Sequence, residues 1–483
     1  MNGNGYNANT LPLRGKIGYA LGEMPTAIGY NIFQTYFLFF LTDIAGIPSL
    51  YGGLITSVLV IWDGISNMII GYLSDNSKNT NGRRRPYMIV GLIPFTITLI
   101  LLFVAFDISN TALVAYFMIV GLVYSASYNL YLTPFYALGA EITTDYDDRN
   151  TLRSICGYVI YIGVWVATSW PMYIGEFAMK AGASEESSWT IAVVIMSLLG
   201  LMTGFISIMS VKGKESRDAE EATEKQENIL VNYLELLKNR AVKSMVIITV
   251  FYGVMISLAA SAFVYLMDYT MQLSGAMQGT YWTIYSVSTF VMIPIANIIA
   301  NKAGKVRCLI IINTLSVIGC IFFAFFGIPT FLYLVIFSIL YNFADAAYWT
   351  IGYSVIYDLS EVDEIVSGKR REGAIIGLVT LAQKIGQSLG LVLIGVILGL
   401  IGYNDKTAVY SEHIADGILK LNTLGPGIFL IIISLMLIRY PVTRETFAKI
   451  QDGLRLRKEG KGIPVEGLEK ILPKKVVKEK RFK

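Results

Sequence analysis

The sequence predicts an all-α integral membrane protein with twelve transmembrane helices in two halves of six. Three observations lead to this prediction: the apolar composition, a series of apolar runs of bilayer-spanning length, and one long polar segment in the middle. Of the 483 residues, 54% are hydrophobic and only 15% are charged, which is too apolar for a soluble multidomain protein. An apolar run of about 20 residues crosses the bilayer core as a helix.

Twelve such runs can be read along the chain. They lie at about 18–43, 50–74, 87–106, 111–139, 154–177, 189–211, 242–268, 278–301, 307–327, 330–357, 373–402 and 418–440. The longest polar segment separates the sixth run from the seventh and holds no stretch able to cross. We therefore expect an N-terminal segment (1–15), an N-terminal six-helix bundle (16–211), a central loop (212–241), a C-terminal six-helix bundle (242–440) and a basic tail (441–483).

Basic residues indicate how these helices are oriented. The loops after even-numbered helices carry Lys and Arg, for example Lys212 and Lys302, whereas most loops after odd-numbered helices carry neither. The positive-inside rule then predicts a multi-pass protein of the cell membrane with both termini and the central loop in the cytoplasm.

The composition also excludes several functional classes. The three cysteines show no metal-binding spacing, His413 is the only histidine, and no catalytic triad or Gly-rich phosphate loop is visible. The sequence therefore predicts neither an enzyme nor a bound cofactor or metal. The net charge of +4 collects in loops, so we expect a bilayer and a small-molecule substrate as partners, with no nucleic acid and no obligate protein partner.

The most informative motif is IWDGISN at 61–67, which puts a carboxylate inside an apolar run. An ionised Asp at the bilayer centre costs about 3 kcal/mol, so a helix keeps one mainly to bind an ion, a proton or a substrate. Asp63, Ser66 and Asn67 share one helix face and present oxygens that a small cation can bridge. A carboxylate paired with a neighbouring helix for packing alone is the structural alternative.

Lys384 is a second charged residue inside an apolar run, where placing an ammonium in the bilayer costs free energy. It shares a helix face with Thr380 and Gln387. An ammonium inside an apolar run needs an anionic partner, and Asp345, Asp63 or an acidic substrate could supply it. A purely structural ion pair is the alternative for this lysine.

Polar and aromatic residues in two other runs are suited to a polyhydroxylated ligand. Asp345 and Trp349 lie one turn apart with Asn342 beside them, and amides, carboxylates and an aromatic plane together suit a sugar. In the first run, a similar polar stripe starts at Glu23, which could instead pair with Arg14 or Lys16. We predict a substrate-binding set of Glu23, Tyr30, Asn31, Gln34, Asp345, Trp349, Thr380, Lys384 and Gln387.

The turn after the second run combines an acidic residue, a glycine turn and an arginine cluster. These residues are Asp75, Gly82, Arg83, Arg84 and Arg85, and a fainter copy follows the eighth run at 301–307. Such a turn can clamp neighbouring helix ends by charge and dipole contacts during a conformational change. A basic loop that only sets topology is the alternative.

Several stretches together resemble one known family. They are YFLFFLTDIAG at 36–46, WDGISN at 62–67 with Gly71, GRRRP at 82–86, TPFY at 133–136 and LGLIGY at 398–403. From 16 to 440 the chain resembles the major facilitator fold and, within it, the glycoside–pentoside–hexuronide cation symporters. The resemblance implies two pseudo-symmetric six-helix bundles and alternating access around a central site.

The resemblance also implies roles for particular residues. The cation site of the family uses the Asp63 face together with a polar residue of the fourth helix, which by position is Asn129, and a lysine like Lys384 lies between cation and substrate. The fullest form of the family has a second carboxylate where this chain has Asn67, so H⁺ is expected over Na⁺. The positions that grip galactosides in the melibiose permease read Ala27, Leu132 and Gly157 here.

We therefore expect cation-coupled symport of a glycoside or related small polar solute, with H⁺ as the expected coupling ion. Because the galactoside grip is missing, an uncoupled facilitator or a carrier of a different, even amphipathic, substrate stays open.

Overall fold

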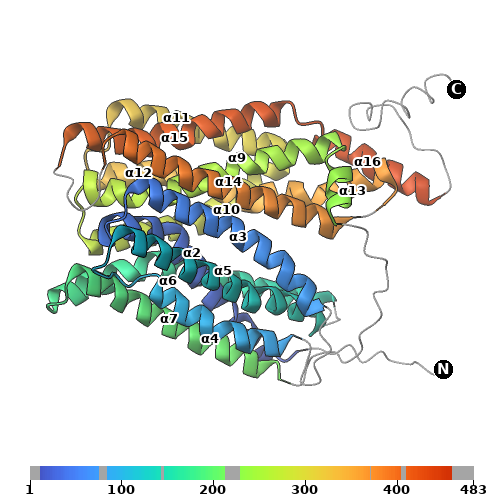
Figure 1. Cartoon of the computed structure of the whole chain (residues 1–483). Coiled ribbons are helices and arrows are strands. Elements are labelled where there is room, and N and C mark those ends of the chain that lie inside the picture. Colours follow the sequence, from blue (N-terminus) through green and yellow to red (C-terminus); the bar gives the residue numbers. More distant parts are fainter. Residues whose placement is uncertain are drawn as a thin grey trace. The chain divides into compact units, whose positions relative to one another are not determined.

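The computed structural model of the chain describes residues 11–75, 84–142, 146–212, 229–369, 371–403 and 410–459, and Figure 1 shows these parts as long helices joined by short connections. The first half contains α1 (Leu13–Ala20), α2 (Glu23–Phe39), η1 (Phe40–Ile44), α3 (Ser49–Asp75), α4 (Arg85–Leu101), α5 (Asn110–Glu141), α6 (Tyr146–Lys180) and α7 (Glu185–Ser210). The remainder contains α8 (Ile229–Leu236), α9 (Arg240–Tyr265), η2 (Leu266–Thr270), α10 (Gly275–Ala303), α11 (Lys305–Phe326), α12 (Phe331–Ala347), η3 (Tyr348–Gly352), α13 (Tyr353–Ser367), α14 (Glu372–Leu400), α15 (Glu412–Ile438) and α16 (Arg444–Lys458). The three η elements are π-helical turns.

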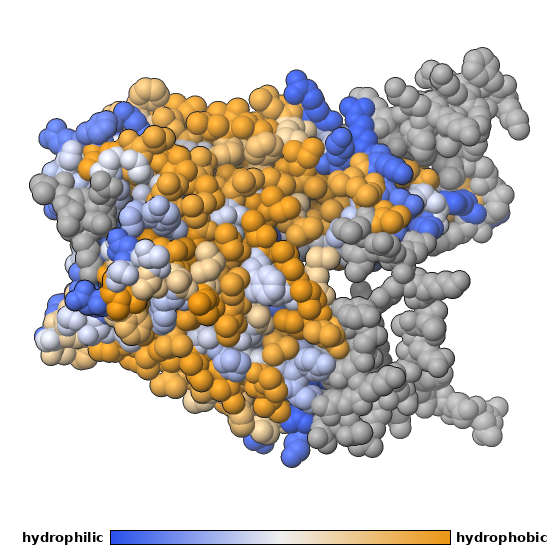
Figure 2. Space-filling view, in the orientation of Figure 1, coloured by the Kyte–Doolittle hydropathy of each residue, from blue (hydrophilic) through white to orange (hydrophobic). Residues whose placement is uncertain are grey.

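Ten helices in the described ranges are long and apolar enough to cross a membrane. The other two predicted runs correspond to α4, which has 17 residues, and to α2 continued by η1. Large apolar side chains remain exposed on the helices, such as Phe325 at 88% and Leu400 at 81%. Figure 2 shows hydrophobic residues covering most of the visible face, with hydrophilic ones near the helix ends. The predicted all-helical membrane architecture is confirmed.

Some helices extend beyond the predicted apolar runs. The tenth run was expected to end at 357, yet α13 continues to Ser367. A helix satisfies its own backbone hydrogen bonds and needs no apolar residues once it leaves the bilayer. It stops at Gly368, whose φ of 79° places it in the left-handed region and whose N–H bonds back to the Glu364 carbonyl.

The chain folds into two compact units. Unit 1 comprises Met1–Ala222, Ala260–Ser286 and Leu391–Asp416, and unit 2 comprises Thr223–Ala259, Val287–Gly390 and Gly417–Lys483. In unit 1, α3 and α4 both pack on α5, and α2 packs on α6 and α7. Glycine permits a close approach of α4 to α5: a Cβ on Gly91 would lie 2.7 Å from the backbone nitrogen of Tyr131. This packing holds α3 and α5, which carry the candidate cation site, side by side.

In unit 2, small residues bring α9 against α14. A Cβ on Gly386 would lie 2.1 Å from the Val250 carbonyl oxygen, and one on Gly253 would lie 2.6 Å from that of Gln383. The Ser257 hydroxyl donates to the Gln387 carbonyl at 2.8 Å, which closes the contact with a hydrogen bond. The glycines of α14 thus serve helix packing and fix the face on which Lys384 stands.

The ends of α2 and α9, both in unit 1, have the same backbone geometry. Each α-helix passes into a π-helical turn, then into a residue of positive φ, and then into the next helix. The positive values are 71° at Gly46 and 50° at Gln272. The backbone hydrogen bonds that end the two π-helical turns also match. Ala45 N–H donates to the Phe40 carbonyl, and Met271 N–H donates to the Leu266 carbonyl. This repeated geometry is what an internal sequence repeat predicts.

Candidate functional site

Four residues predicted for the cation site lie together between α3 and α5. The Asn129 amide of α5 donates to Asp63 Oδ1 at 2.7 Å and to Ser66 Oγ at 2.9 Å. On its other side, Asn129 Oδ1 accepts a hydrogen bond from Asn67 Nδ2 at 2.9 Å. Asn129 is 1% exposed, whereas Asp63 is half-buried and Asn67 is exposed. The buried amide therefore joins the three polar groups of α3.

Two more contacts hold this face of α3 in place. Asn67 Nδ2 also donates to Thr133 Oγ1 at 3.2 Å. Next to the carboxylate, Trp62 Nε1 donates to the Leu122 carbonyl of α5 at 3.0 Å. The tryptophan of the WDG sequence thus fixes the distance between α3 and α5 at the level of Asp63, and Thr133 is a member of the cluster that sequence reasoning did not assign to it.

Unit 2 contains a comparable amide bridge, in which an asparagine binds two hydroxyls. Asn342 of α12 donates to Ser288 Oγ at 2.6 Å and to Thr289 Oγ1 at 2.9 Å, both on α10. Asn342 is fully buried. Both units therefore join two helices through one buried asparagine, and in unit 1 that asparagine also binds a carboxylate.

Two of the residues predicted to bind substrate, Asp345 and Trp349, belong to a connected row in unit 2. Trp349 Nε1 donates to Asp345 Oδ1 at 3.1 Å, and the Trp349 ring stacks on Tyr353 with centroids 5.4 Å apart. The Tyr353 hydroxyl in turn donates to Gln383 Oε1 at 2.8 Å, which links the row to α14. The Trp349 side chain is 39% exposed, so one aromatic face of the row is accessible. Tyr353 was not predicted, because its link to Gln383 spans two helices.

Beside Gln383, α14 carries the other three predicted residues. Lys384 is half-buried, Gln387 is buried, and Thr380 is exposed. The α-helix spacing places them along one side, as predicted. Asp63 lies in unit 1 and Lys384 in unit 2, so pairing between them stays a prediction.

The predicted residues of α2 differ in accessibility. Tyr30 and Asn31 are half-buried, and the Asn31 amide donates to the Ala27 carbonyl at 2.8 Å. Gln34 is 6% exposed, and its backbone carbonyl accepts from Ser261 at 2.8 Å. Glu23 is fully buried. In this conformation, Tyr30 and Asn31 are the more accessible part of the stripe.

Two residues of the predicted gating turn contact helix ends. Arg84 Nη1 donates to Ser74 Oγ at 2.9 Å near the end of α3, and Arg85 Nε donates to the Ile208 carbonyl at 3.1 Å near the end of α7. Cations at helix C-termini interact favourably with the helix dipole. Gly82 and Arg83 lie outside the described residues, as does the side chain of Asp75.

A family model described as MFS/sugar transport protein matches residues 18–444. The chain belongs to this family. The uncharacterised symporter YnaJ of Bacillus subtilis (strain 168) is 26% identical over 443 residues, covering 90% of this chain and 92% of the relative. The glucuronide carrier protein homolog of Escherichia coli (strain K12) is 21% identical over 445 residues, covering 91% and 95%. The crystal structure of D-xylose-proton symporter shows the same fold, with 17% identity, coverage of 88% and 96%, and a TM-score of 0.61.

These findings confirm the resemblance to glycoside–pentoside–hexuronide cation symporters within the major facilitator superfamily. The protein is a multi-pass membrane transporter, and its family consists of transporters, not enzymes. The description of the family model names sugar transport.

Two stretches that carry the family resemblance meet in unit 1. Tyr403, the last residue of LGLIGY, donates a short hydrogen bond to Asp43 Oδ1 of the YFLFFLTDIAG stretch. Thr42 donates to Asp43 Oδ2 at 2.6 Å, and its hydroxyl lies 2.8 Å from that of Tyr265. Sequence reasoning quoted both stretches and assigned neither Asp43 nor Tyr403 a role. The sequence feature that could have pointed to Asp43 is a carboxylate at the end of an apolar run.

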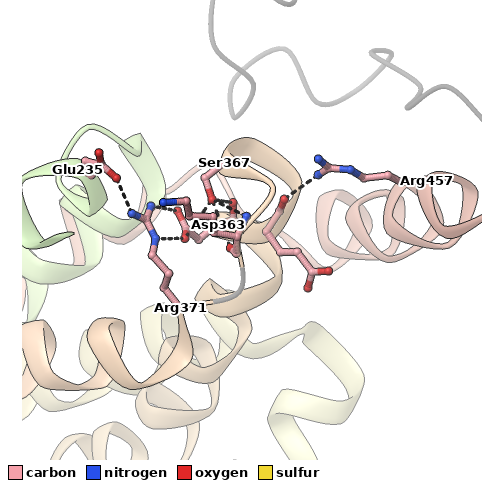
Figure 3. A network of polar contacts seen from close by, with 7 residues as sticks. Glu235, Asp363, Ser367, Arg371 and Arg457 are labelled. Atoms are coloured by element: carbon pink, nitrogen blue, oxygen red, sulfur yellow. Dashed lines mark hydrogen bonds and ion pairs between the residues drawn. The ribbon is translucent and has the colours of Figure 1, made fainter. Parts of the chain in front are cut away.

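A second polar cluster, in unit 2, surrounds Arg371 (Figure 3). Its guanidinium binds both oxygens of Asp363, at 3.0 and 3.1 Å, and Glu235 Oε2 of α8 at 2.8 Å. Arg457 of α16 donates to the Glu364 carbonyl at 3.0 Å. Hydrogen bonding to Asp363 and Glu235 raises the pKa of Arg371 above its ordinary value, so this group stays charged. The cluster ties the predicted central loop and tail to the α13–α14 turn.

Proposed function

We propose that this transporter is a proton-coupled symporter for a glycoside or a related small polar solute, with Asp63 as the coupling residue. The observation that carries the proposal is the contact between Asp63 and the buried Asn129 amide. It joins the carboxylate to a cluster that also includes Ser66, Asn67 and Thr133.

The amide donors of this cluster favour H⁺ over Na⁺. A hard cation is bound by several oxygens, with affinity set by the number of charged ligands and by the geometry. Here Asn67 and Asn129 direct amide nitrogens into the cluster, to Asn129 Oδ1 and Asp63 Oδ1. Nitrogen donors compete with a metal cation for these oxygens, whereas a proton needs only one carboxylate oxygen.

Protonation of Asp63 would change this hydrogen-bond network. The ionised carboxylate accepts from Asn129 Nδ2, but a protonated carboxyl also acts as a donor and needs an acceptor. If the Asn129 amide rotates to offer Oδ1 to Asp63, it releases Asn67. We infer that proton binding at Asp63 loosens the Asn67–Asn129 link between α3 and α5, which couples the proton to helix movement.

For the substrate, the row from Asp345 to Gln383 supplies a carboxylate, an indole, a phenol and an amide. Sugars are bound by hydrogen-bonding groups with an aromatic ring against an apolar face. Similarity to the glucuronide carrier protein homolog and a family described as sugar transport support a solute of this class. We place the remaining contacts on Tyr30, Asn31 and Lys384, in an alternating-access cycle in the cell membrane with both termini cytoplasmic.

Uptake by the purified protein in proteoliposomes tests this function. A panel of labelled monosaccharides, disaccharides, glycosides and uronides is offered with an imposed proton gradient, a sodium gradient or none. We expect accumulation of at least one solute above equilibrium with the proton gradient, and little added effect of sodium. Equilibration that ignores both gradients would identify an uncoupled facilitator instead, and sodium-driven accumulation would contradict the proton assignment.

A further inference from the structure

A carboxyl group outside the predicted set of cation ligands is enclosed at the start of α2. Glu23 is 0% exposed and begins α2, which packs on α6, α7 and α5. The packing is tight: a Cβ on the preceding Gly22 would lie 2.5 Å from Phe135 and from Ser207 Oγ, and 2.9 Å from the Tyr131 hydroxyl. The Glu23 side chain is therefore enclosed where these helices pack together.

The two oxygens of this carboxyl differ in their partners. Tyr136 of α5 donates its hydroxyl to Glu23 Oε2 at 3.2 Å. Glu23 Oε1 is buried and has no hydrogen-bond partner among the residues that the structure describes. The two nearby tyrosines do not reach it, since Tyr131 donates to the Gly22 carbonyl and Tyr19 to the Phe135 carbonyl. An orphaned carboxylate oxygen is costly, whereas a protonated oxygen is neutral.

The cation nearest to this carboxyl does not pair with it in this conformation. The Arg153 guanidinium of α6 lies over the Tyr136 ring, 5.7 Å from its centroid. Tyr136 is 43% exposed and Arg153 is also exposed. Tyr136 therefore contacts both groups, with its hydroxyl on the carboxyl and its ring beside the guanidinium.

The titratable groups around Glu23 are Tyr19 from α1, Tyr131 and Tyr136 from α5, and Cys156 and Arg153 from α6. Tyrosine and cysteine are neutral below about pH 8. Arg153 is therefore the one charged member of this described set at neutral pH, and its distance from Glu23 decides which form of the carboxyl is stable.

We propose that Glu23 is a second proton-binding site, protonated on Oε1 while Tyr136 binds Oε2, and ionised when Tyr136 moves away and Arg153 reaches the carboxylate. In that step the O–H bond at Oε1 breaks, the proton passes to water, and the Arg153 guanidinium neutralises the charge that remains. The site goes beyond the proposed function, because this proton is bound apart from Asp63 and needs no substrate.

Infrared spectroscopy of the full-length protein in lipid vesicles tests this proposal with the proton as the only ligand. The carboxylic C=O stretch is followed as pH is raised from about 5 to 9, the range in which buried carboxyls titrate. We expect Glu23→Gln to remove one titrating C=O band that Asp63→Asn retains. Glu176→Gln is the control, since Glu176 is paired with Lys180 at 2.6 Å and is expected to contribute no such band.

Two further variants keep the carboxyl and change its surroundings. Arg153→Gln removes the countercharge of the ionised form, so it should move the loss of the band upward by about one pH unit. Tyr136→Phe removes the hydroxyl that binds the carboxyl in its protonated form, so it should move the loss of the band downward. These shifts test the site even if Glu23→Gln fails to fold. The proposal is overturned if the band survives in Glu23→Gln, if it does not titrate, or if neither neighbour shifts it. These results do not depend on whether Asp63 is the coupling residue, so the two proposals can fail separately.

Discussion

Asn129 and Asn342 are buried asparagines that each join two helices, and the presence of the Asp63 carboxylate distinguishes the candidate coupling site from the bridge in unit 2. Both units hold two helices together through a buried asparagine, which binds hydroxyls in unit 2 and a carboxylate, a hydroxyl and an amide in unit 1. A hydroxyl does not change charge at physiological pH, whereas a carboxyl can. Among these contacts, only Asp63 can therefore respond to a proton gradient.

Replacing Asp63 with Asn keeps the size of the side chain and removes its charge change. We expect proton-driven accumulation to fall at least tenfold, while the amount of folded protein and equilibration down a gradient are kept. Uptake in proteoliposomes with and without a proton gradient measures both quantities. Thr289→Val is the matched control, because it removes one of the two hydroxyls that bind the Asn342 amide in unit 2. Undiminished accumulation in Asp63→Asn would remove Asp63 from the mechanism.

Asn67 tests the choice between H⁺ and Na⁺. Asn67→Asp places a second carboxylate beside Asp63, and additional charged ligands raise the affinity of an oxygen site for cations. We expect a sodium gradient to stimulate this variant more than it stimulates the natural sequence. Uptake at constant pH with increasing sodium measures the gain. If sodium has no effect in the variant, the geometry of the cluster rather than its charge excludes the ion.

The sequence predicted the members of this cluster on α3 because i,i+3 and i,i+4 spacing defines a helix face. Asn129 required the family resemblance, since no local pattern links two different helices. Thr133, Tyr353 and Asp43 were missed for the same reason. Their partners Asn67, Gln383 and Tyr403 are far away in the sequence, and only the packing of the helices brings them together.

At the scale of elements, the π-helical turn η3 shapes the candidate substrate row. It follows α12 directly and carries Trp349, whose ring contacts Asp345 one turn earlier and Tyr353 one turn later. Such turns interrupt α-helices frequently at functional sites. Since α12, η3 and α13 form one continuous apolar span, hydropathy alone could not reveal this interruption.

Trp349→Ala should weaken substrate binding with little loss of stability, because the ring is partly exposed. A stacked aromatic contact of about 1.4 kcal/mol corresponds to a tenfold change in affinity. We expect the half-saturation concentration of a transported glycoside to rise about tenfold, and Trp349→Phe to restore part of the loss. An unchanged half-saturation concentration in Trp349→Ala would exclude this ring from the substrate site.

The Arg371 cluster makes a separate prediction about stability. Its two acidic partners differ in burial, since the side chain of Asp363 is 1% exposed and that of Glu235 is 44% exposed. Breaking a buried, hydrogen-bonded ion pair costs about 3 kcal/mol, and an exposed pair contributes about 0.5 kcal/mol. Asp363→Asn should therefore lower the thermal unfolding temperature in detergent by several times more than Glu235→Gln. Equal effects would show that solvent screens both contacts alike.

At the scale of the whole molecule, apolar length and composition predicted the fold class and most of the spans. The ends of helices were harder to predict, because polar residues continue α13 beyond the apolar run and hold it by contacts such as Asp363 with Arg371. The repeated π-turns at η1 and η2 were also not predicted. Apart from Gly46, neither turn has a sequence feature that distinguishes it from the end of an ordinary α-helix.

The contact between Asp43 and Tyr403 joins the first predicted span to the end of the eleventh. If the two predicted bundles separate at the Asp43–Tyr403 contact during transport, this hydrogen bond must break. Its strength then helps to set how long the state with the contact formed, here called the closed state, persists. Tyr403→Phe removes the donor and keeps the ring. We expect this variant to populate the open state more often, and Thr42→Val, which removes the other hydroxyl bound to Asp43, to act in the same direction.

Labelling of an introduced cysteine measures this opening. Gln34 is 6% exposed, and its backbone carbonyl accepts from Ser261 in the same unit. The three native cysteines are buried and provide a low background. We expect a maleimide to label Gln34→Cys several times faster when Tyr403→Phe is added, while labelling of Ser207→Cys, a fully buried site at the other end of the bundle, stays slow. If the rate at position 34 does not change, the hydrogen bond stabilises η1 locally and does not control access.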